Sequence, residues 1–573
     1  MKNHEIALLF ERIANALELK GGNTYRINSY RNAARTIRDL TEDIEVLARE
    51  GRLEDIPGVG EGMAGKISEY IATGKISKYE EAMKGVSEET ITLMQIPGLG
   101  PKTVALLNEK LSISNLADLE KAIQEGRLNG LPGIGGKKVE NISRGIELFK
   151  KSQQRIPIGT AYPIVKGIVE VLKRDSHITD IQPAGSLRRM KETVGDIDIL
   201  ATGTNGKDII QSFVNMRGVT RILAAGDTKG SVHVEEGVQI DLRVVQEDEF
   251  GSALQYFTGS KEHNIHLREI AKKRGYKISE YGIFKGDKKI GGRREEDIYK
   301  TLSMDWIPPE LRENTGEIEA AQEGKLPRLI ELSDIKGDLH GHSNRTDGTN
   351  TFEEMAERAM KMGYKYLVVS DHSKSLHVAN GLTEEELFEE IEEIDKLNKK
   401  LKGFTLLKAT EVDIMSDGSI DFPDTALEKL DIVIASIHSG FKQGKKKITE
   451  RMVAAIHNPY VNIIAHPTGR LIGKREAYEI DLDKVIEACA GTGTALELNC
   501  YYDRLDLDDS NCRKAKDAGV MISISTDSHN VDQMWMMELG VGIARRGWLE
   551  ARNVINTLSL DDLKAFCKKK RKG

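Results

Sequence analysis

At 573 residues the chain exceeds the size that one hydrophobic core usually serves, so several domains are expected. Its 39% hydrophobic and 30% charged residues exclude a disordered or membrane-embedded chain, and its net charge of −7 excludes a simple basic coat for nucleic acid. No apolar run reaches the length of a membrane span, so no membrane partner is expected. Residues 1–5 lack the features of a signal peptide, and the cysteines lack CxxC spacing; both observations favour a cytoplasmic protein with buried thiols.

Three Pro-Gly-x-Gly segments occur within residues 1–150, beginning at Pro57, Pro97 and Pro132, and a lysine follows each of them (Lys66, Lys102 and Lys137). The glycines permit a tight turn, and the free N–H groups at the start of the following helix form a site for one DNA phosphate. The repetition favours helix-hairpin-helix motifs over a purely structural helical bundle. Such motifs hold the DNA backbone without reading its sequence.

Residues 151–250 alternate apolar strands with helical stretches, which indicates an α/β domain. Asp196 and Asp198 share one face of a predicted strand because side chains alternate, and Asp241 lies on a later strand. An Asp-x-Asp pair alone is weak evidence, since acid pairs facing solvent are common. The three carboxylates together predict a cage for two Mg²⁺ or Mn²⁺ ions about 4 Å apart, the arrangement that activates an attacking oxygen and stabilises leaving pyrophosphate.

Gly185-Ser186-Leu187-Arg188-Arg189 lies just upstream of Gly195-Asp196, and its hydroxyl, backbone donors and guanidinium groups suit the outer oxygens of a triphosphate. In these residues the chain resembles the family X DNA polymerases, whose signature is Gly-Ser, two arginines, Gly-Asp-x-Asp and a third, later Asp. The resemblance implies that Gly185, Ser186, Arg189 and Gly195 contact a dNTP. Met190 departs from the Gly that many members have after the arginines.

The resemblance extends to the family's N-terminal lyase domain through residues 28–34 and 65–75. It places Lys66 where that domain keeps the lysine that forms a Schiff base with an abasic sugar, a reaction that requires a depressed amine pKa. Gly62 and Glu54 stand where lyase-active members carry lysines. A plain phosphate contact or an exposed helix lysine is therefore the alternative for Lys66.

A Tyr-Phe-Thr-Gly-Ser motif follows the predicted palm. The resemblance implies that Tyr256, Phe257 and Gly259 lie beside the incoming sugar; an aromatic pair buried in a core is the alternative. It also implies that Asn264 contacts the incoming base in the minor groove and that Arg268 contacts the templating strand. Lys261 replaces an acid found in some relatives, and we expect its charge to strengthen nucleotide binding.

Beyond a polar segment at 313–334, which we expect to be a linker, successive apolar runs end in residues that can bind metals. Carboxyl ends of parallel strands meet at one face of a barrel, so this pattern predicts a TIM-like barrel of about seven strands with a metal site at that face. The residues at or near these ends are His340, His342, Asp347, His372, Glu411, His438, His466, Asp527 and His529.

This region resembles the PHP domain, a distorted barrel that holds a trinuclear metal cluster. The resemblance implies three ligand sets: His340, His342, Glu411 and Asp527; Glu411, His438 and His466; and Asp347, His372 and His529. Imidazole combined with carboxylate suits Zn²⁺ or Mn²⁺. Because all the motif ligands are present, we expect an active hydrolase rather than a degenerate scaffold.

The fold class is therefore expected to be multidomain α/β, with N-terminal helical helix-hairpin-helix domains, an α/β nucleotidyltransferase palm with a small α/β subdomain, and a C-terminal distorted (β/α)7 barrel. The expected domains are 1–80, lyase-like and helical; 81–150, a helix-hairpin-helix subdomain; 151–250, the palm; 251–312, a nucleotide- and template-selecting subdomain; 313–334, the linker; and 335–573, the PHP phosphoesterase domain.

The order of the modules predicts a monomeric DNA polymerase that fills short gaps in base excision repair, with gapped or nicked double-stranded DNA and dNTPs as partners. The barrel is expected to add 3′–5′ exonuclease activity, with AP-endonuclease cleavage as a further possibility. A template-independent nucleotidyltransferase would share the aspartates, but Asn264 and Arg268 favour a template. A small-molecule phosphatase would explain the barrel alone, and a non-enzymatic DNA-end binding module would leave both ligand sets unused.

Overall fold

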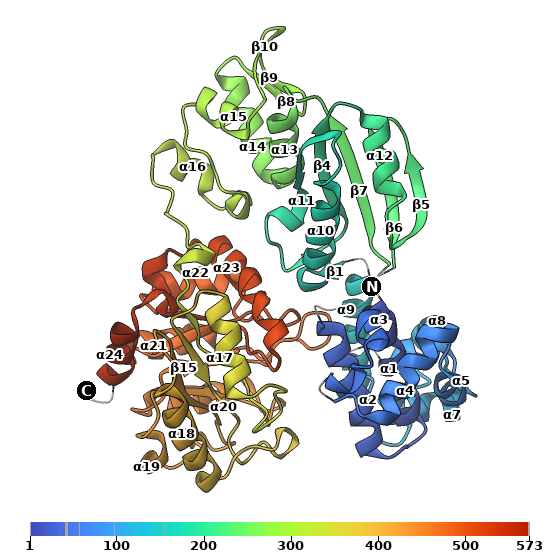
Figure 1. Ribbon diagram of the computed structural model, residues 1–573, viewed down its shortest axis with the longest axis vertical. Coiled ribbons are helices and arrows are strands. Elements are labelled where there is room, and N and C mark those ends of the chain that lie inside the picture. Colours follow the sequence, from blue (N-terminus) through green and yellow to red (C-terminus); the bar gives the residue numbers. More distant parts are fainter. Residues whose placement is uncertain are drawn as a thin grey trace. The chain divides into compact units, whose positions relative to one another are not determined.

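The computed structural model describes residues 2–40, 44–56, 58–94, 96, 98–153, 155–235 and 237–570, which form two compact units (Figure 1). The first unit comprises residues 1–154 with the short segments Leu471–Glu476 and Asn530–Gln533. The second comprises Arg155–Arg470, Ala477–His529 and Met534–Gly573. Within the described residues, no helix combines the length and apolar character needed to cross a membrane.

Helices that surround two separate hydrophobic cores build the first unit. Phe10 and Ile67 are fully buried in one core, and Val104 and Ile142 in the other. Because most of these helices are too short to be stable alone, burial of their apolar faces holds them in place. The elements are α1 (Lys2–Leu19), α2 (Thr24–Asp39), α3 (Ile44–Arg49), η1 (Leu53–Asp55), α4 (Glu61–Thr73), α5 (Ser77–Met83), α6 (Glu88–Leu93), α7 (Pro101–Leu111), α8 (Leu116–Gln124) and α9 (Gly136–Gln153).

The three predicted hairpin turns share one backbone geometry. Gly58, Gly98 and Gly133 have φ angles of 79°, 89° and 74°, a left-handed conformation that glycine adopts without steric cost. Gly60 and Gly100 are the N-caps of α4 and α7. The structure thus directs three helix N-termini out of glycine turns, although Pro57 and Pro97 lie outside the described residues.

The palm is a five-stranded sheet in the order β2-β4-β7-β6-β5, and α12 lies against β5, β6 and β7 (Figure 1). β4 and β7 are parallel neighbours, whereas the other pairs are antiparallel. The Asn205 side chain caps α12, whose buried face includes Ile210 and Phe213. The elements are β1 (Ile156–Pro157), α10 (Ile158–Leu172), β2 (Ile178–Pro183), α11 (Gly185–Arg188), β3 (Thr193–Val194), β4 (Ile197–Gly203), α12 (Gly206–Val214), β5 (Val219–Ala225), β6 (Lys229–Val234), β7 (Gln239–Val245) and α13 (Phe250–Thr258).

A small α/β subdomain follows the palm and includes most of the segment expected to be a linker. Residues 313–334 contain α16, whose Ile318 and Ala321 are buried in the same core as Leu267 and Ile298. The segment was expected to be a linker, but part of it forms a helix that packs on this core. The two apolar residues are three positions apart and therefore share one helix face. The elements are α14 (Lys261–Lys273), β8 (Lys277–Ser279), β9 (Gly282–Lys285), β10 (Lys288–Gly291), α15 (Glu295–Thr301), η2 (Pro309–Leu311), α16 (Glu317–Gln322) and η3 (Leu332–Asp334).

A seven-stranded parallel sheet in sequential order, β11 to β17, forms the barrel. Its central strands read as continuous apolar runs because both faces are buried. The chain beyond β11 pairs with the chain beyond β17, where the His342 N–H donates to the Ser528 carbonyl over 2.8 Å. The sheet therefore nearly closes, and the predicted fold class is confirmed.

The barrel strands are β11 (Gly337–Asp338), β12 (Tyr366–Val369), β13 (Thr405–Asp413), β14 (Ile432–Ser436), β15 (Ile463–Ile464), β16 (Ala495–Asn499) and β17 (Ile522–Ser525). The helices and turns between and after them are α17 (Phe352–Lys361), η4 (His377–Ala379), α18 (Glu384–Asn398), α19 (Asp424–Leu427), α20 (Lys445–His457), α21 (Leu482–Thr492), α22 (Asp509–Asp517), η5 (Val531–Met536), α23 (Met537–Arg546), η6 (Ala551–Asn553), η7 (Ile555–Thr557) and α24 (Leu560–Lys570).

Candidate functional site

The three palm carboxylates converge on two adjacent strands. Asp198 of β4 lies directly opposite Asp241 of β7 in the parallel register. Asp196 lies in the bend just before β4, close enough for its charge to act on Asp198. The Asp241 carboxylate accepts hydrogen bonds from the Ser231 hydroxyl over 2.7 Å and from the Gln239 amide over 3.0 Å. These contacts orient Asp241 toward the other two aspartates.

The negative charge of these three carboxylates favours the binding of cations. Burial, followed by the nearby charges of Asp196 and Asp241, raises the pKa of Asp198 to about 6. The ammonium of Lys229 lies 2.9 Å from Asp241 Oδ2 and supplies one positive charge. A donor set of oxygens with unbalanced negative charge fits divalent ions such as Mg²⁺ or Mn²⁺. The sequence pattern did not single out Lys229, because its proximity depends on β6 pairing with β7.

Gly185 lies at a close approach between the Gly-Ser turn and the aspartates. Its φ is 63°, and a Cβ at this position would lie 3.0 Å from Asp198 Oδ2. The Ala184 N–H donates to the Asp198 carbonyl over 2.8 Å. Any larger residue at position 185 would therefore displace Asp198. Ser186 follows on α11, whereas Gly195 and Asp196 are exposed ahead of β4.

The two arginines of the signature have different surroundings. Arg188 forms a bidentate ion pair with Glu295 at 2.7 Å and donates to the Thr258 hydroxyl. Arg189 donates to the Thr258 carbonyl over 2.6 Å and to Glu313 over 2.9 Å. The paired arginines were expected to hold a triphosphate together, but Arg188 is used internally to join the palm to α15.

The sugar-contact motif and the base-selecting residues are linked by hydrogen bonds. Asn264 donates to the Tyr256 carbonyl over 2.7 Å and accepts from the Gln255 amide over 2.8 Å, so its amide supports the turn after α13. The rings of Tyr256 and Phe257 meet edge to face at 5.2 Å, and both are only partly buried. A Cβ on Gly259 would lie 2.7 Å from Asn264 Oδ1, which makes glycine necessary at this position.

Lys261 and Arg268 are exposed on α14, and the Arg268 guanidinium donates to the Asn264 carbonyl over 3.1 Å. Neither side chain is buried, so both are accessible to a nucleotide or a DNA strand. The structure thus gathers the six predicted selection residues around the end of α13 and the start of α14.

Lys66 lies on α4 at the edge of a surface cavity of about 650 Å³. Burial, together with the positive charges of Arg26 and Lys78, lowers the pKa of its amine. The amine also donates to the Gly62 carbonyl and lies 5.8 Å from the centre of the Tyr30 ring. The cavity lining includes Arg26 and Lys66 together with Glu54 and Glu61, so its formal charges cancel. A lysine with a lowered pKa at the edge of a surface cavity has the properties that an amine nucleophile requires.

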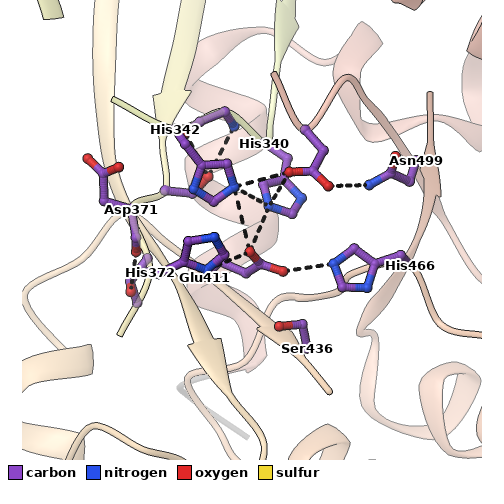
Figure 2. Close-up of polar contacts among 12 residues, drawn as sticks. His340, His342, Asp371, His372, Glu411, Ser436, His466 and Asn499 are labelled. Carbon is purple, nitrogen blue, oxygen red and sulfur yellow. Dashed lines mark hydrogen bonds and ion pairs between the residues drawn. The ribbon is translucent and has the colours of Figure 1, made fainter. Parts of the chain in front are cut away.

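Every predicted barrel ligand lies at the carboxyl end of the strands. Figure 2 shows the Glu411 carboxylate among the imidazoles of His340, His342 and His466. Glu411 lies 2.9 Å from His466, 3.1 Å from His372 and 3.4 Å from both His340 and His438. Burial would raise the pKa of Glu411, but the surrounding imidazoles hold it well below its usual range.

Three groups of these side chains are compact enough to hold metal ions. They are His342, Asp347, His372 and His529; His340, His342 and Asp527; and His372, Glu411 and His438. The groups differ from the predicted sets in three ways: His342 and His372 are each shared by two groups, Glu411 belongs to one group instead of bridging two, and His466 approaches Glu411 without belonging to a group. Sharing follows from the close stacking of these two imidazoles, whose ring centroids lie 4.3 Å apart.

Outer carboxylates orient the ligands. Glu497 lies 2.7 Å from His340 Nδ1 and accepts from the His466 N–H, and Asp413 lies 2.6 Å from His438 Nδ1. Such contacts fix the imidazole tautomer and turn the other ring nitrogen toward the metal. Among the described residues, the buried atoms His342 Nδ1 and Asp347 Oδ1 have no hydrogen-bond partner, so both are available as metal ligands. No sequence pattern singled out either outer carboxylate.

A positively charged side chain also adjoins this cluster. Arg504, in the loop after β16, lies 3.7 Å from Asp527 Oδ2. Burial followed by the nearby charge of Arg504 lowers the pKa of His466 to about 4, which keeps that imidazole neutral at pH 7. No sequence signal marked Arg504, because it lies in an irregular loop.

The fold and the two ligand sets define a nucleotidyltransferase palm joined to a metal-dependent phosphoesterase barrel. Family models match four parts of the chain: "Helix-hairpin-helix domain" at residues 1–76, "SAM-like Helix-hairpin-helix tandem" at 90–147, "DNA polymerase beta thumb" at 253–313 and "PHP domain" at 338–500.

Whole-chain similarity is also present. The chain is 42% identical to the DNA polymerase/3′-5′ exonuclease PolX of Bacillus subtilis, over 99% of this chain and 100% of that protein. It is 27% identical to DNA polymerase lambda of Arabidopsis thaliana over 54% of this chain and 62% of that protein, and 30% identical to a probable phosphatase of Thermoanaerobacter over 41% and 95%. The chain belongs to the family X DNA polymerases that carry a C-terminal PHP domain.

Proposed function

We propose that this protein fills short gaps in double-stranded DNA during base excision repair and trims 3′ ends with its barrel. It is a DNA polymerase with a metal-dependent 3′–5′ exonuclease domain, the two activities named in its full-length relative. The proposal that the palm synthesises DNA is supported above all by the direct pairing of Asp198 with Asp241. We further propose that it acts as a cytoplasmic monomer.

In the palm, Asp196 and Asp198 would hold two Mg²⁺ or Mn²⁺ ions, and Asp241 the one nearer the primer. When bound, the ions polarise the α-phosphate and stabilise the leaving pyrophosphate. Ser231 and Gln239 keep the Asp241 carboxylate in place, and the Lys229 ammonium lies against the same carboxylate. Gly185, Ser186, Arg189 and Gly195 would bind the triphosphate, with Arg189 exchanging Glu313 for phosphate oxygens.

The sugar and base are assigned to neighbouring residues. Tyr256 and Phe257 would stack beside the deoxyribose, and the close approach of Gly259 to Asn264 keeps that wall narrow. Asn264 would contact the incoming base, Arg268 the templating strand, and Lys261 the nucleotide. A template-dependent reaction is favoured by Arg268, which is exposed on α14. Asn264 is buried and would exchange its hydrogen bonds with Gln255 and Tyr256 for the incoming base.

In the barrel, the three ligand groups would hold Zn²⁺ or Mn²⁺ ions, which supply a hydrolytic nucleophile and polarise the scissile phosphate when bound. Glu497 and Asp413 hold His340 and His438 in their metal-binding orientation. Asp527 is kept ionised: burial would raise its pKa, but His340 and the neighbouring imidazoles hold it well below its usual range. AP-endonuclease cleavage is a second reaction that the same centre would support, since both substrates are phosphodiesters.

Gap filling is tested with DNA whose single-nucleotide gap carries either a 5′-phosphate or a 5′-hydroxyl. Because hairpin helix N-termini and the cations Arg26 and Lys66 at the cavity suit a downstream phosphate, we expect kcat/KM for insertion to be roughly tenfold higher with the 5′-phosphate. A recessed primer without a downstream strand serves as the reference. Equal values for all three DNAs would contradict gap filling.

Lys66 is proposed to form a Schiff base with the abasic sugar at the 5′ margin of the gap. We expect wild-type protein to be trapped on DNA with a 5′-deoxyribose phosphate by borohydride, and Lys66→Ala to reduce trapping at least about tenfold, because the lowered pKa frees the amine for attack. Lys75→Ala, an exposed lysine after the same helix, is the matched control. Undiminished trapping by Lys66→Ala would assign Lys66 to phosphate contact alone.

A further inference from the structure

The short palm segment 189–192 packs directly against the barrel. It follows Gly185 and Ser186 in the chain and precedes the aspartates. It folds back on Ser186, because the Lys191 N–H donates to the Ser186 carbonyl over 3.0 Å. Three successive contacts join it to barrel residues. These contacts involve Arg189, Met190 and Glu192, which are three of the four residues of the segment.

The first contact explains the departure at Met190. This residue has a φ of 53°, a conformation that favours glycine and is strained for a side chain as large as methionine. Its side chain is nevertheless buried, at 8% exposure. A Cβ built on Gly542 of α23 would lie 2.3 Å from Met190 Cε and 3.1 Å from Met190 Cβ. Met190 thus fills a hollow that exists only because residue 542 is glycine.

Polar contacts flank this packing. Arg546 of α23, nearly fully buried, donates to the Arg189 carbonyl over 2.7 Å and to Glu313 over 3.0 Å. Glu313 is the carboxylate that also receives the Arg189 guanidinium. Burial would raise the pKa of Glu313, but Arg189 and Arg546 hold it below its usual value, so it stays ionised between them.

The third contact leads toward the barrel's metal cluster. Arg470 pairs with Glu192 at 2.7 Å and donates to the Arg504 carbonyl over 3.0 Å. Arg504 in turn lies beside Asp527. A continuous set of contacts therefore runs from a metal-binding carboxylate to the palm segment that precedes Gly195.

From this arrangement we propose that the barrel, through Gly542 and Arg546 of α23, positions the 189–192 segment and thereby sets the affinity of the palm for dNTP. The inference rests on the proposed nucleotide-binding role of Ser186 and Arg189. Gly542 and Arg546 are positioning residues: they touch neither substrate nor reacting atoms, and they act through the backbone of Arg189 and the side chain of Met190. The barrel is thus part of the polymerase site as well as a nuclease.

The test replaces Gly542 with leucine and measures dNTP insertion into gapped DNA. The new side chain pushes Met190 outward, so we expect Gly542→Leu to raise KM for dNTP at least about fivefold with little change in kcat. Exonuclease activity on single-stranded DNA should be retained. The double variant Met190→Gly/Gly542→Leu removes the clash between the two side chains, and glycine adopts the left-handed φ at position 190 without strain. Its KM for dNTP should therefore lie within about twofold of the KM of the single variant Met190→Gly.

Gly491→Leu is the matched control, because Gly491 is exposed on α21 with no atom within 4 Å of an added Cβ. Thermal unfolding shows whether Gly542→Leu is folded. If it is not, KM for dNTP is measured for Arg546→Met, which adds no bulk. An unchanged KM in the folded variant, or no rescue by Met190→Gly, would overturn the proposal. Failure of the polymerase assignment would look different: wild-type protein would then not insert dNTP at all.

Discussion

Asp241→Asn should reduce dNTP insertion into gapped DNA by a factor on the order of 10³ and leave 3′-end degradation unchanged. Asp241 faces Asp198 across two parallel strands, so the substitution removes one of three carboxylates from the cluster and keeps the shape of the side chain. The measurement is single-turnover insertion of one nucleotide, followed in the same preparation by degradation of a single-stranded oligonucleotide.

Asp180→Asn is the control for this result, because Asp180 is an exposed aspartate on β2 of the same sheet. It should insert nucleotides at the wild-type rate. Normal insertion by Asp241→Asn would contradict the location of the synthetic site. Loss of both insertion and degradation would show that the two activities share these aspartates.

Glu411→Gln should have the opposite effect, lowering 3′-end degradation by a factor on the order of 10³ while dNTP insertion continues. Glu411 is 1% exposed and contacts the imidazoles of His340, His372 and His466. Replacing it with a neutral amide removes the carboxylate that these groups surround and weakens metal binding. The readouts are degradation of a labelled oligonucleotide and the metal content of the purified protein.

Glu385→Gln, in the first turn of α18 and exposed to solvent, is the matched control for degradation. Persistent degradation by a Glu411→Gln protein with reduced metal content would place the nuclease elsewhere in the chain. Because the proposed barrel contacts to residues 189–192 do not involve Glu411, its substitution should leave KM for dNTP within about twofold of wild type.

Local periodicity was enough to predict much of the fold. The period of two predicted that Asp196 and Asp198 lie close together; the structure places Asp198 on β4 and Asp196 in the bend just before it. The barrel was predicted because apolar runs ended repeatedly in ligand residues. Neighbouring strands that are distant in sequence were harder to predict. Lys229 contacts Asp241 only because β6 pairs with β7. The sequence did not distinguish the role of Arg188 from that of Arg189, because the ion pair of Arg188 with Glu295 depends on the tertiary fold.

Met190 shows the limit of sequence patterns most clearly. As a departure from a signature, it only put the turn in doubt. The Met190 side chain packs against Gly542, which lies on α23, after the last barrel strand in the sequence. The neighbouring Arg546 is 357 positions from the carbonyl to which it donates. Likewise, α16 was missed within residues 313–334 because its two buried apolar residues are too few to produce a helical pattern.

We propose that one chain contains two separate sites, one that lengthens a DNA 3′ end and one that shortens it. The most direct test follows an end-labelled primer in gapped DNA, with and without dNTPs, for wild type, Asp241→Asn and Glu411→Gln. We expect wild type to lengthen and shorten the primer, Asp241→Asn only to shorten it, and Glu411→Gln only to lengthen it. Loss of both reactions in either folded variant would contradict the proposal.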